Sequence, residues 1–552
     1  MTTDNHPMFT QHLYKYLFLL ITISCFAISC SSRFSHTVQQ MPEPPVASKS
    51  GAIPDYTDST ITIAAGAHYD RSRLHTFFYG RHYRTAWTTP VKVQVLNIGT
   101  AKGGLKPLQL GGSRQTISLR AEDSTGTEYV LRSIDKEPAS ALSERWKQSY
   151  LANIARDATS ATHPYAALTL PTMADAIGIY HTVPELVFIP HDPRLGEYKK
   201  AIGGTMALLE RRPTGDQRDN SNMGNAEKVK STRSAITERL TDNDSDFDAR
   251  FFLRSRLFDM LLGDWSRHED NWRWVEFEKS KNEYTYKAIP RDRDNIFYML
   301  VDAPIPWFFM RTGFKPHFQT YRKKVRNIEK LNRSGRDLDE LILAELELKD
   351  WLEIADSVQA ALTDEVIEVA FKQMPDNIYQ LTALPMAEKL KSRRNQLKQV
   401  AENYYKAISR DAKVVGTDKH ELFQIEVLNE NQVQVSVYKT KKDGEEHQLL
   451  FNRTYHAKET EKINLYGLNG NDHFIIKGNV KPNIKIFLWG GAGEDSYVVE
   501  DKKSKVGKAI RINDSKYRNT FDVGERTKVD IDDDLRAKEF SATGWLLRYY
   551  LN

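Results

Sequence analysis

The chain has 552 residues, of which 40% are apolar and 27% charged, and its formal net charge is +5. This length provides roughly two to four domains that can each bury a core. Because basic and acidic residues are interspersed and the net charge is mild, nucleic acid is not an expected partner. Both cysteines lie within the first 30 residues, which excludes a disulfide framework in the remainder.

The first 30 residues have the layout of a signal peptide. A polar start precedes an apolar run at residues 16–26, which at about 11 residues is too short to span a bilayer. The stretch Ala27–Cys30 resembles the lipobox of bacterial lipoproteins. We therefore expect lipidation at Cys30, with fatty acids such as palmitate, and a lipid-anchored protein of the cell envelope, at the outer membrane. Cleavage at Cys25 and an ordinary secretory peptide are the alternatives.

Residues 31–60 are rich in Pro, Ser and Thr and lack apolar periodicity, which predicts a flexible tether. The next segment, 61–212, carries short β-rich runs and two helical patterns, and it is predicted to be an N-terminal lobe. Asp123–Gly126 is a hairpin turn signal. The predicted strands are 91–96, 115–120, 128–134, 185–189 and 205–210, and the predicted helices are 140–157 and 165–178.

Residues 213–412 are predicted to form a helical C-terminal lobe. Apolar residues recur at helical spacing from Phe247 to Leu261 and again across 335–410. From residue 413 to 552 the pattern returns to strands and turns. The predicted fold class is therefore α+β, with a β-rich C-terminal domain.

The densest chemistry lies in Gly263–Trp272 and, about twenty residues later, in Ile289–Asp294. A helix, a loop with Arg-His and then Asn, a hairpin and a strand ending in Asp-x-Asp is an arrangement used in phosphoryl transfer. The loop supplies a base and one metal ligand, and the acidic strand end supplies the second. Such oxygen ligands suit Mg²⁺ or Mn²⁺.

This motif resembles the atypical protein-kinase-like folds, namely the HipA-type, phosphatidylinositol-kinase-like and secreted CotH-like kinases. The resemblance implies a two-lobed body that binds ATP. It implies that Asn271 and Asp292 bind the metal and that Asp294 supports Asp292. Arg267 and His268 would brace the loop.

Ser266 stands where these families have the catalytic aspartate, and a serine cannot act as a base at neutral pH. Asp264, two residues earlier, is the candidate substitute. Three functions remain open: a degenerate nucleotide- and metal-binding domain, an active metal-dependent phosphotransferase, or metal-dependent hydrolysis in which Asp264 holds a water.

Upstream residues fit the same resemblance between about 95 and 300. Gly111 and Gly112 would let backbone N–H groups approach phosphates. Arg132, or Lys136 after it, would contact a phosphate from the strand that ends in lysine in these families. The hinge strand between the lobes would contain Glu210.

Two further segments, Ser160–Tyr165 and Val414–Lys419, look like a larger group of exported proteins of uncharacterised activity. In that group the same region accompanies a calcineurin-like phosphoesterase or an outer-membrane barrel. This chain has neither, so the resemblance implies the middle module alone, with an outer-membrane protein as a candidate partner.

Near the C-terminus, Gly467–Ile475 and Gly490–Val498 both fit Gly-x-x-Gly-x-Asp-x-apolar. The pattern resembles haemolysin-type calcium repeats, which implies Ca²⁺ at Asp472 and Asp495 and a non-enzymatic envelope or adhesion module. About fourteen residues separate the two stretches, whereas the family stacks them directly. A β-sandwich or short β-stack with ordinary turns is the alternative.

Simpler structural roles also remain open in the central motif. Trp265, Trp272 and Trp274 are expected to pack in the core rather than bind a ligand. His268 could be a hydrogen-bonded structural residue. Asp292 and Asp294 could form surface ion pairs with the neighbouring Arg291 and Arg293.

Overall fold

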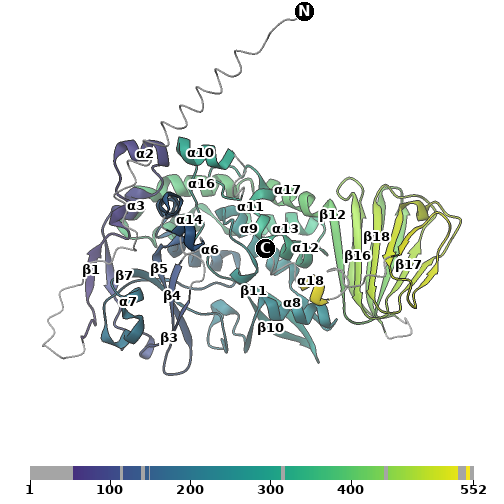
Figure 1. The fold of residues 1–552 in the computed structure, drawn as a ribbon, viewed down its shortest axis with the longest axis horizontal. Coiled ribbons are helices and arrows are strands. Elements are labelled where there is room, and N and C mark those ends of the chain that lie inside the picture. Colours follow the sequence, from purple (N-terminus) through teal and green to yellow (C-terminus); the bar gives the residue numbers. More distant parts are fainter. Residues whose placement is uncertain are drawn as a thin grey trace, which may run out of the picture.

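The computed structural model describes residues 54–111, 116–138, 143–147, 149–311, 317–440, 446–531 and 542–546 (Figure 1). The predicted lipidation site Cys30, most of the tether and Gly112 lie outside these ranges. Within them, no helix combines the length and the apolar character needed to traverse a bilayer. The α+β prediction with a β-rich C-terminal region is confirmed.

The first part of the chain builds a seven-stranded sheet in the order β1-β2-β6-β7-β5-β4-β3. Only β2 and β6 are parallel neighbours. The predicted hairpin is present as β4 and β5, and its turn is held by N–H groups that donate to Asp123. The strands are β1 (Thr60–Ile63), β2 (Val91–Val95), β3 (Lys106–Gly111), β4 (Thr116–Glu122), β5 (Glu128–Lys136), β6 (Glu185–Ile189) and β7 (Thr205–Arg211).

Helices cover this sheet, and two of them arise where the sequence predicted only strands. Helices α2 (Arg73–Tyr79) and α3 (Arg84–Thr88) lie between β1 and β2. Ser72 caps α2 by accepting from the N–H of His75, a start signal that was missed. The others in this part are α4 (Glu144–Lys147), α5 (Tyr150–Asp157), α6 (Leu170–Ile177) and α7 (Lys199–Ile202).

The helical lobe is centred on α9 (Ala249–Leu262), which is buried along most of its length. Gly263 ends it with a φ of 74°, the left-handed conformation that glycine adopts without strain. A four-stranded sheet combines two strands that precede α9 in the chain with two that follow it, in the order β8-β10-β11-β9. Its strands are β8 (Lys228–Ser231), β9 (Ser245–Phe247), β10 (Trp272–Ser280) and β11 (Glu283–Pro290).

Most of the remaining helices surround α9, and their apolar faces form one large core with it. The predicted helical region at 335–410 is confirmed. The helices are α8 (Thr232–Thr241), α10 (Pro304–Arg311), α11 (Ile328–Leu331), α12 (Arg336–Ile342), α13 (Leu348–Ala361), α14 (Asp364–Phe371), α15 (Asp376–Ile378), α16 (Leu384–Arg394) and α17 (Leu397–Ser409).

The C-terminal domain is a parallel solenoid, in which the chain alternates between two sheets (Figure 1). One sheet contains β12 (Asp411–Thr417), β16 (Lys462–Asn469), β18 (Lys485–Ala492), β20 (Ile510–Asp514) and β22 (Lys528–Ile531). The other contains β13 (Glu421–Asn429), β17 (His473–Lys477), β19 (Ser496–Val499), β21 (Thr520–Asp522) and the hairpin β14 (Gln432–Thr440) and β15 (Glu446–His456).

The coils of this solenoid stack the two glycine-rich stretches on each other. Leu468 pairs with Gly491 and His473 with Ser496 in parallel register. The segment between the two stretches is therefore one full coil, not an interruption. In the sequence this gap counts against haemolysin-type calcium repeats and leaves a short β-stack open, and the two stretches do stack in coils longer than those repeats use.

Candidate functional site

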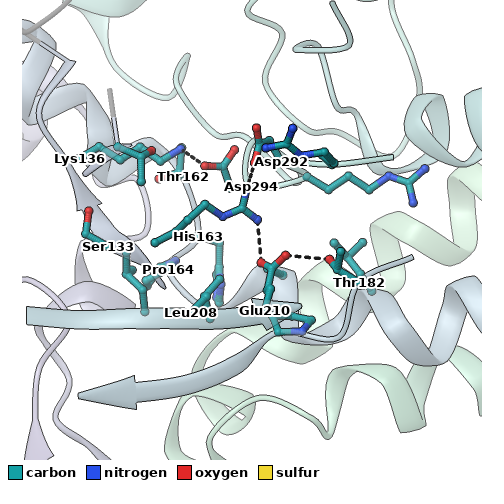
Figure 2. Close-up of a pocket in the computed structure, with 18 of the residues that line it drawn as sticks. Ser133, Lys136, Thr162, His163, Pro164, Thr182, Leu208, Glu210, Asp292 and Asp294 are labelled. Atoms are coloured by element: carbon teal, nitrogen blue, oxygen red, sulfur yellow. Dashed lines mark hydrogen bonds and ion pairs between the residues drawn. The ribbon is translucent and has the colours of Figure 1, made fainter. Parts of the chain in front are cut away.

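A pocket lies where the seven-stranded sheet meets the segment that follows β11 (Figure 2). It brings together five residues predicted from sequence. Arg132 and Lys136 come from β5, Glu210 from β7, and Asp292 and Asp294 from the loop after β11. Residues 160 positions apart in the chain therefore converge as the two-lobe hypothesis requires.

Ion pairs cross this pocket. Lys136 Nζ lies 2.7 Å from Asp294 Oδ2, and Arg132 bridges Asp292 and Glu210, with 2.7 Å from its Nη2 to Glu210 Oε1. Thr182 Oγ1 donates to the other oxygen of Glu210 at 2.8 Å (Figure 2). The two aspartates thus pair with cations of the opposite lobe, not with their sequence neighbours Arg291 and Arg293.

The electrostatics keep Asp294 ionised. Burial alone would raise the pKa of Asp294, but Lys136 and Arg132 outweigh it and hold the pKa below its usual value. Asp292 adopts a φ of 53°, in the left-handed region, where aspartate is tolerated better than most residues. Two carboxylates on one short loop supply oxygen donors of the kind that Mg²⁺ or Mn²⁺ takes.

Arginines are in excess at the same pocket. Burial, and then the nearby Arg273 and Arg132, lowers the pKa of Arg291 to about 9. Arg212 lies near Arg291 but does not line the pocket, and it pairs with Glu128. Among the described residues, no carboxylate lies within ion-pairing distance of the Arg291 guanidinium. A half-buried cation without an ion-pair partner favours an anionic ligand.

Arg267 holds the predicted loop in shape. Its Nη1 donates to the Arg291 carbonyl at 2.8 Å, and its Nη2 donates to the Asn271 carbonyl at 2.6 Å. Its guanidinium also lies 4.6 Å from the centre of the Trp272 ring. The Asn271 side-chain amide donates to the Ser266 carbonyl, which leaves Oδ1 as the atom that could bind a cation.

Asn271 is a neighbour of the acidic loop through its backbone. The N–H of Arg291 donates to the Asn271 carbonyl at 2.9 Å, directly beyond the paired residues Trp272 and Pro290. Asn271 itself does not line the pocket. The structure therefore places Asn271 beside the start of the acidic loop through its backbone, but outside the pocket lining.

A buried aspartate that sequence reasoning missed connects both halves of the motif. Asp259, on α9, accepts from Arg293 Nε at 2.9 Å and lies 3.4 Å from Arg267 Nε. It also accepts from Arg256, which is held in turn by Asp339. The available signal was a charged pair three residues apart, Arg256 and Asp259, in the otherwise apolar second half of the helix.

Asp264 belongs to this buried network and does not line the pocket. It accepts from Arg267 Nη1 at 3.2 Å and from the N–H of Ser266 at 3.0 Å. Burial raises its pKa to about 6 against the opposing effect of Arg267. A carboxylate that is 1% exposed and paired with Arg267 is poorly placed to take a proton from a substrate.

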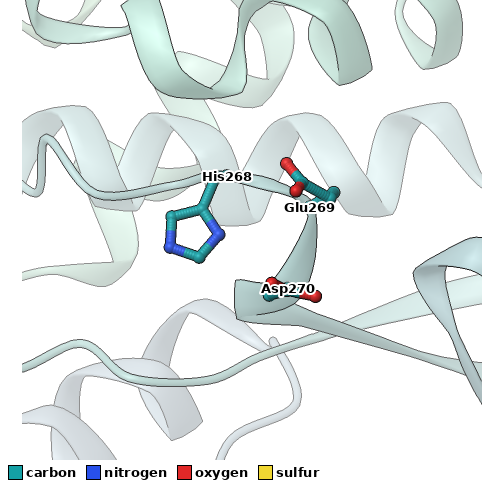
Figure 3. A group of neighbouring side chains, drawn as sticks. All are labelled: His268, Glu269 and Asp270. Atoms are coloured by element: carbon teal, nitrogen blue, oxygen red, sulfur yellow. The ribbon is translucent and has the colours of Figure 1, made fainter. Parts of the chain in front are cut away.

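His268, Glu269 and Asp270 are consecutive residues whose ligand atoms lie within 4.8 Å of one another (Figure 3). Asp270 is exposed and Glu269 partly so. Exposed acidic groups of this kind are common without a metal.

The side chains of Trp272 and Trp274 are fully buried, which confirms their predicted role in the core.

One predicted residue, Gly111, lies outside the pocket lining, and one residue that was not predicted, His163, belongs to it. Gly111 ends β3 beside Ser118 and does not line the pocket, while Gly112 lies outside the described residues. His163 does line it and was not predicted as a site residue. Burial lowers the pKa of His163 to about 3, so this imidazole is neutral. It shares a hydrogen bond with Thr382 at 3.0 Å.

In the solenoid, Asp472 and Asp495 belong to a column of four buried acids, the acid column, with Glu421 and Asp514 at its ends. The N–H of Glu421 donates to Asp472 Oδ1, and the N–H of Asp472 donates to Asp495 Oδ1, both at 2.9 Å. Asp472 and Asp495 therefore each accept a hydrogen bond from the backbone of the preceding coil.

The acid column has little counter-charge. Oδ2 of Asp472 and Oδ2 of Asp495 are buried and accept no hydrogen bond from the described residues. A side chain at Gly490 would begin 2.3 Å from Asp514 Oδ2 and 2.5 Å from Asp495 Oδ2, so glycine is required there. Burial and the neighbouring acids raise the pKa of Asp472, and that of Asp495 to about 8.

No family model and no curated protein matches the chain. Among solved structures, it is similar to the crystal structure of the Helicobacter pylori proinflammatory kinase CtkA, at 13% identity and a TM-score of 0.29. That match covers 55% of this chain and 95% of the other. An identity and a TM-score this low do not establish a shared family, so the chemistry of the pocket must be judged from its own residues.

Proposed function

We propose that the pocket binds a phosphorylated ligand, a nucleotide such as ATP, together with Mg²⁺ or Mn²⁺, in a kinase-like domain that has lost catalysis. The observation that carries this proposal is the half-buried Arg291, which has no ion-pair partner among the described residues and lines the pocket together with Asp292 and Asp294. A phosphate would neutralise the arginine, and a cation would bridge phosphate and carboxylate.

Ligand binding would exchange partners within the pocket. Asp292 and Asp294, now paired with Arg132 and Lys136, would turn to the metal ion, and the two freed cations would contact the phosphates. The bound metal would neutralise phosphate charge. Glu210 would keep Arg132 oriented through its 2.7 Å ion pair.

Binding without phosphoryl transfer is favoured over an active phosphotransferase. Ser266 offers no carboxylate, and Asp264 is buried against Arg267. For the same reason, hydrolysis with Asp264 as the holder of a water is not favoured. A ligand-binding domain of this type would act as a sensor or scaffold at the cell envelope.

A thermal-shift measurement tests the binding proposal. ATP with Mg²⁺ or Mn²⁺ is expected to raise the unfolding temperature of the wild type by several degrees, because a ligand that binds only the folded state stabilises it. Asp292→Ala should abolish the metal-dependent part of that shift. Asp219→Ala, which removes an exposed carboxylate outside the pocket, is the matched control and should respond like the wild type. The absence of any shift in the wild type would rule out a nucleotide site.

A second candidate function is calcium binding by the acid column. The unpartnered oxygens of Asp472 and Asp495, together with the nearby Asp514 carboxylate, supply hard oxygen donors in a buried setting. Calcium would then replace protons as the counter-charge of the column. The solenoid would act as a cation-stabilised module for docking or adhesion.

We also propose that the chain is a lipoprotein of the outer membrane, anchored through Cys30. The lipobox-like stretch before that residue supports this. Metabolic labelling with a palmitate analogue is expected to mark the wild-type protein and to lose the mark completely in Cys30→Ser. Cys25→Ser is the control, and its labelling should be unchanged. Labelling that is lost in Cys25→Ser instead would move the anchor to Cys25.

A further inference from the structure

Helix α2 exposes two of its large apolar side chains to solvent. Its inner face places His75 against Asp157, 3.1 Å from Nε2 to Oδ2, and stacks it on the buried Tyr79 with ring centres 4.5 Å apart. Its outer face exposes Leu74 and Phe77, the latter by 64%. Large apolar side chains that a helix turns to water are unfavourable unless another surface covers them.

A second helix extends this face. Helix α10 contacts α2, and the two lie together along the upper edge of the body in Figure 1. The flanking segments are joined by the N–H of His82, which donates to Asp302 at 2.7 Å. On α10, Trp307 and Phe308 are each 50% exposed. The exposed side chains of Leu74, Phe77, Trp307 and Phe308 together form the aromatic ridge.

The charges of the two helices are all positive. Neither α2 nor α10 contains an acidic residue, whereas Arg73 and Arg311 are both exposed. The Arg311 guanidinium lies 4.9 Å from the centre of the Trp307 ring, which places cation and aromatic ring at the same level. Exposed aromatic residues bordered by arginine are typical of protein surfaces that enter the headgroup region of a bilayer.

We propose that the aromatic ridge is a membrane-contact surface that inserts into the headgroup layer of an anionic phospholipid bilayer. Arginines complement the negative headgroups, and the aromatic rings occupy the boundary with the acyl chains. The segment from Cys30 to Pro54 can extend over about 80 Å, enough for an anchored chain to bring this face to its own membrane. Contact through the ridge would add a second membrane signal to one lipid anchor.

Vesicle co-sedimentation tests the proposal without the lipid. Residues 31–552, produced without lipidation, are expected to bind vesicles that contain phosphatidylglycerol and to bind phosphatidylcholine vesicles at least tenfold more weakly. The double variant F77S/W307S should lose at least tenfold in binding to the anionic vesicles. The variant R73E/R311E should lose the preference for anionic lipid, and high salt should weaken binding of the wild type.

Tyr517→Ser is the matched control, since it removes an aromatic ring that is 68% exposed on the solenoid, and it should bind like the wild type. Circular dichroism must show that each variant is folded. Wild-type protein that does not sediment with anionic vesicles would overturn the proposal. Binding of F77S/W307S to anionic vesicles as strong as that of the wild type would also overturn it. A wild-type protein that forms a dimer in analytical ultracentrifugation, loses it in F77S/W307S and does not bind vesicles would show that the ridge contacts a second copy of the chain and not a membrane. The vesicle experiment uses neither nucleotide nor the lipid anchor. Its outcome is therefore independent of whether the pocket binds a nucleotide and of whether Cys30 is lipidated.

Discussion

Asp259→Ala is expected to destabilise the body of the protein by about 3–5 kcal/mol, because it leaves buried arginines without their shared carboxylate. Asp259 is fully buried and neutralises Arg267 and Arg293 together, with additional contact to Arg256. Its pKa is held below the usual value, since those arginines outweigh the effect of burial. Urea unfolding followed by tryptophan fluorescence, which reports on the buried Trp272 and Trp274, measures the loss.

The matched control for this variant is Asp356→Ala. Asp356 is 56% exposed and pairs with Lys398 at 3.0 Å on the surface of the same lobe. Its removal should cost at most about 1 kcal/mol, since exposed ion pairs contribute little. A loss below about 1 kcal/mol for Asp259→Ala would contradict the central role of this carboxylate. If the variant is too unstable to purify, Asp259→Asn keeps the shape of the side chain and should show a smaller loss.

Asp259 also marks the limit of what the sequence could predict about the site. Asp292, Asp294 and Arg267 were found because they stand at fixed spacing within one contiguous motif. Asp259 and Asp339 act through tertiary contacts with arginines as far as 83 positions away, and no local pattern reveals which buried acid meets which base. The pairing of Asp294 with Lys136 was equally invisible, since alternating charges along a strand suggested only local partners.

The helices and strands that the sequence predicted correctly are likewise those with a local pattern. Strands with clear alternation, such as β2, and the turn at Asp123 were predicted almost to the residue. Helix α2 was missed because its apolar residues face outward, so it lacks the pattern that marks a helix packed on a core. The sequence leaves a β-sandwich and a short β-stack both open for the C-terminal region, because coil length depends on how far the chain travels between two sheets, which composition does not determine.

In the absence of calcium, the stability of the solenoid is expected to fall as the pH rises. The fold raises the pKa of Asp495 to about 8, through burial and the nearby Asp514, whereas an unfolded aspartate titrates near 4. The folded state therefore holds this proton more tightly than the unfolded state. The stability that the proton provides is fully present below about pH 4 and is lost as the pH rises to about 8, a change on the order of a few kcal/mol.

Asp495→Asn should remove most of this dependence. The amide keeps an oxygen for the N–H of Asp472, and its NH₂ group can donate toward Asp514 without a titrating charge. In EDTA at pH 8 the variant should therefore be more stable than the wild type, and at pH 5 nearly equal to it. Asp522→Asn, which changes a 60% exposed carboxylate on the same domain, is the control and should follow the wild type.

At pH 8, calcium should make the wild type more stable than Asp495→Asn, the reverse of the result expected in EDTA. Because the cation needs ionised carboxylates, millimolar calcium should stabilise the wild type increasingly as the pH rises, with release of protons. It should have little effect on Asp495→Asn, which loses one ionised ligand. Urea unfolding followed by circular dichroism in EDTA and in calcium measures both effects. If the stability of the wild type in EDTA increases with pH, the acids of the column are not protonated in the folded state. If calcium has no effect on stability at pH 8, the acid column does not bind calcium.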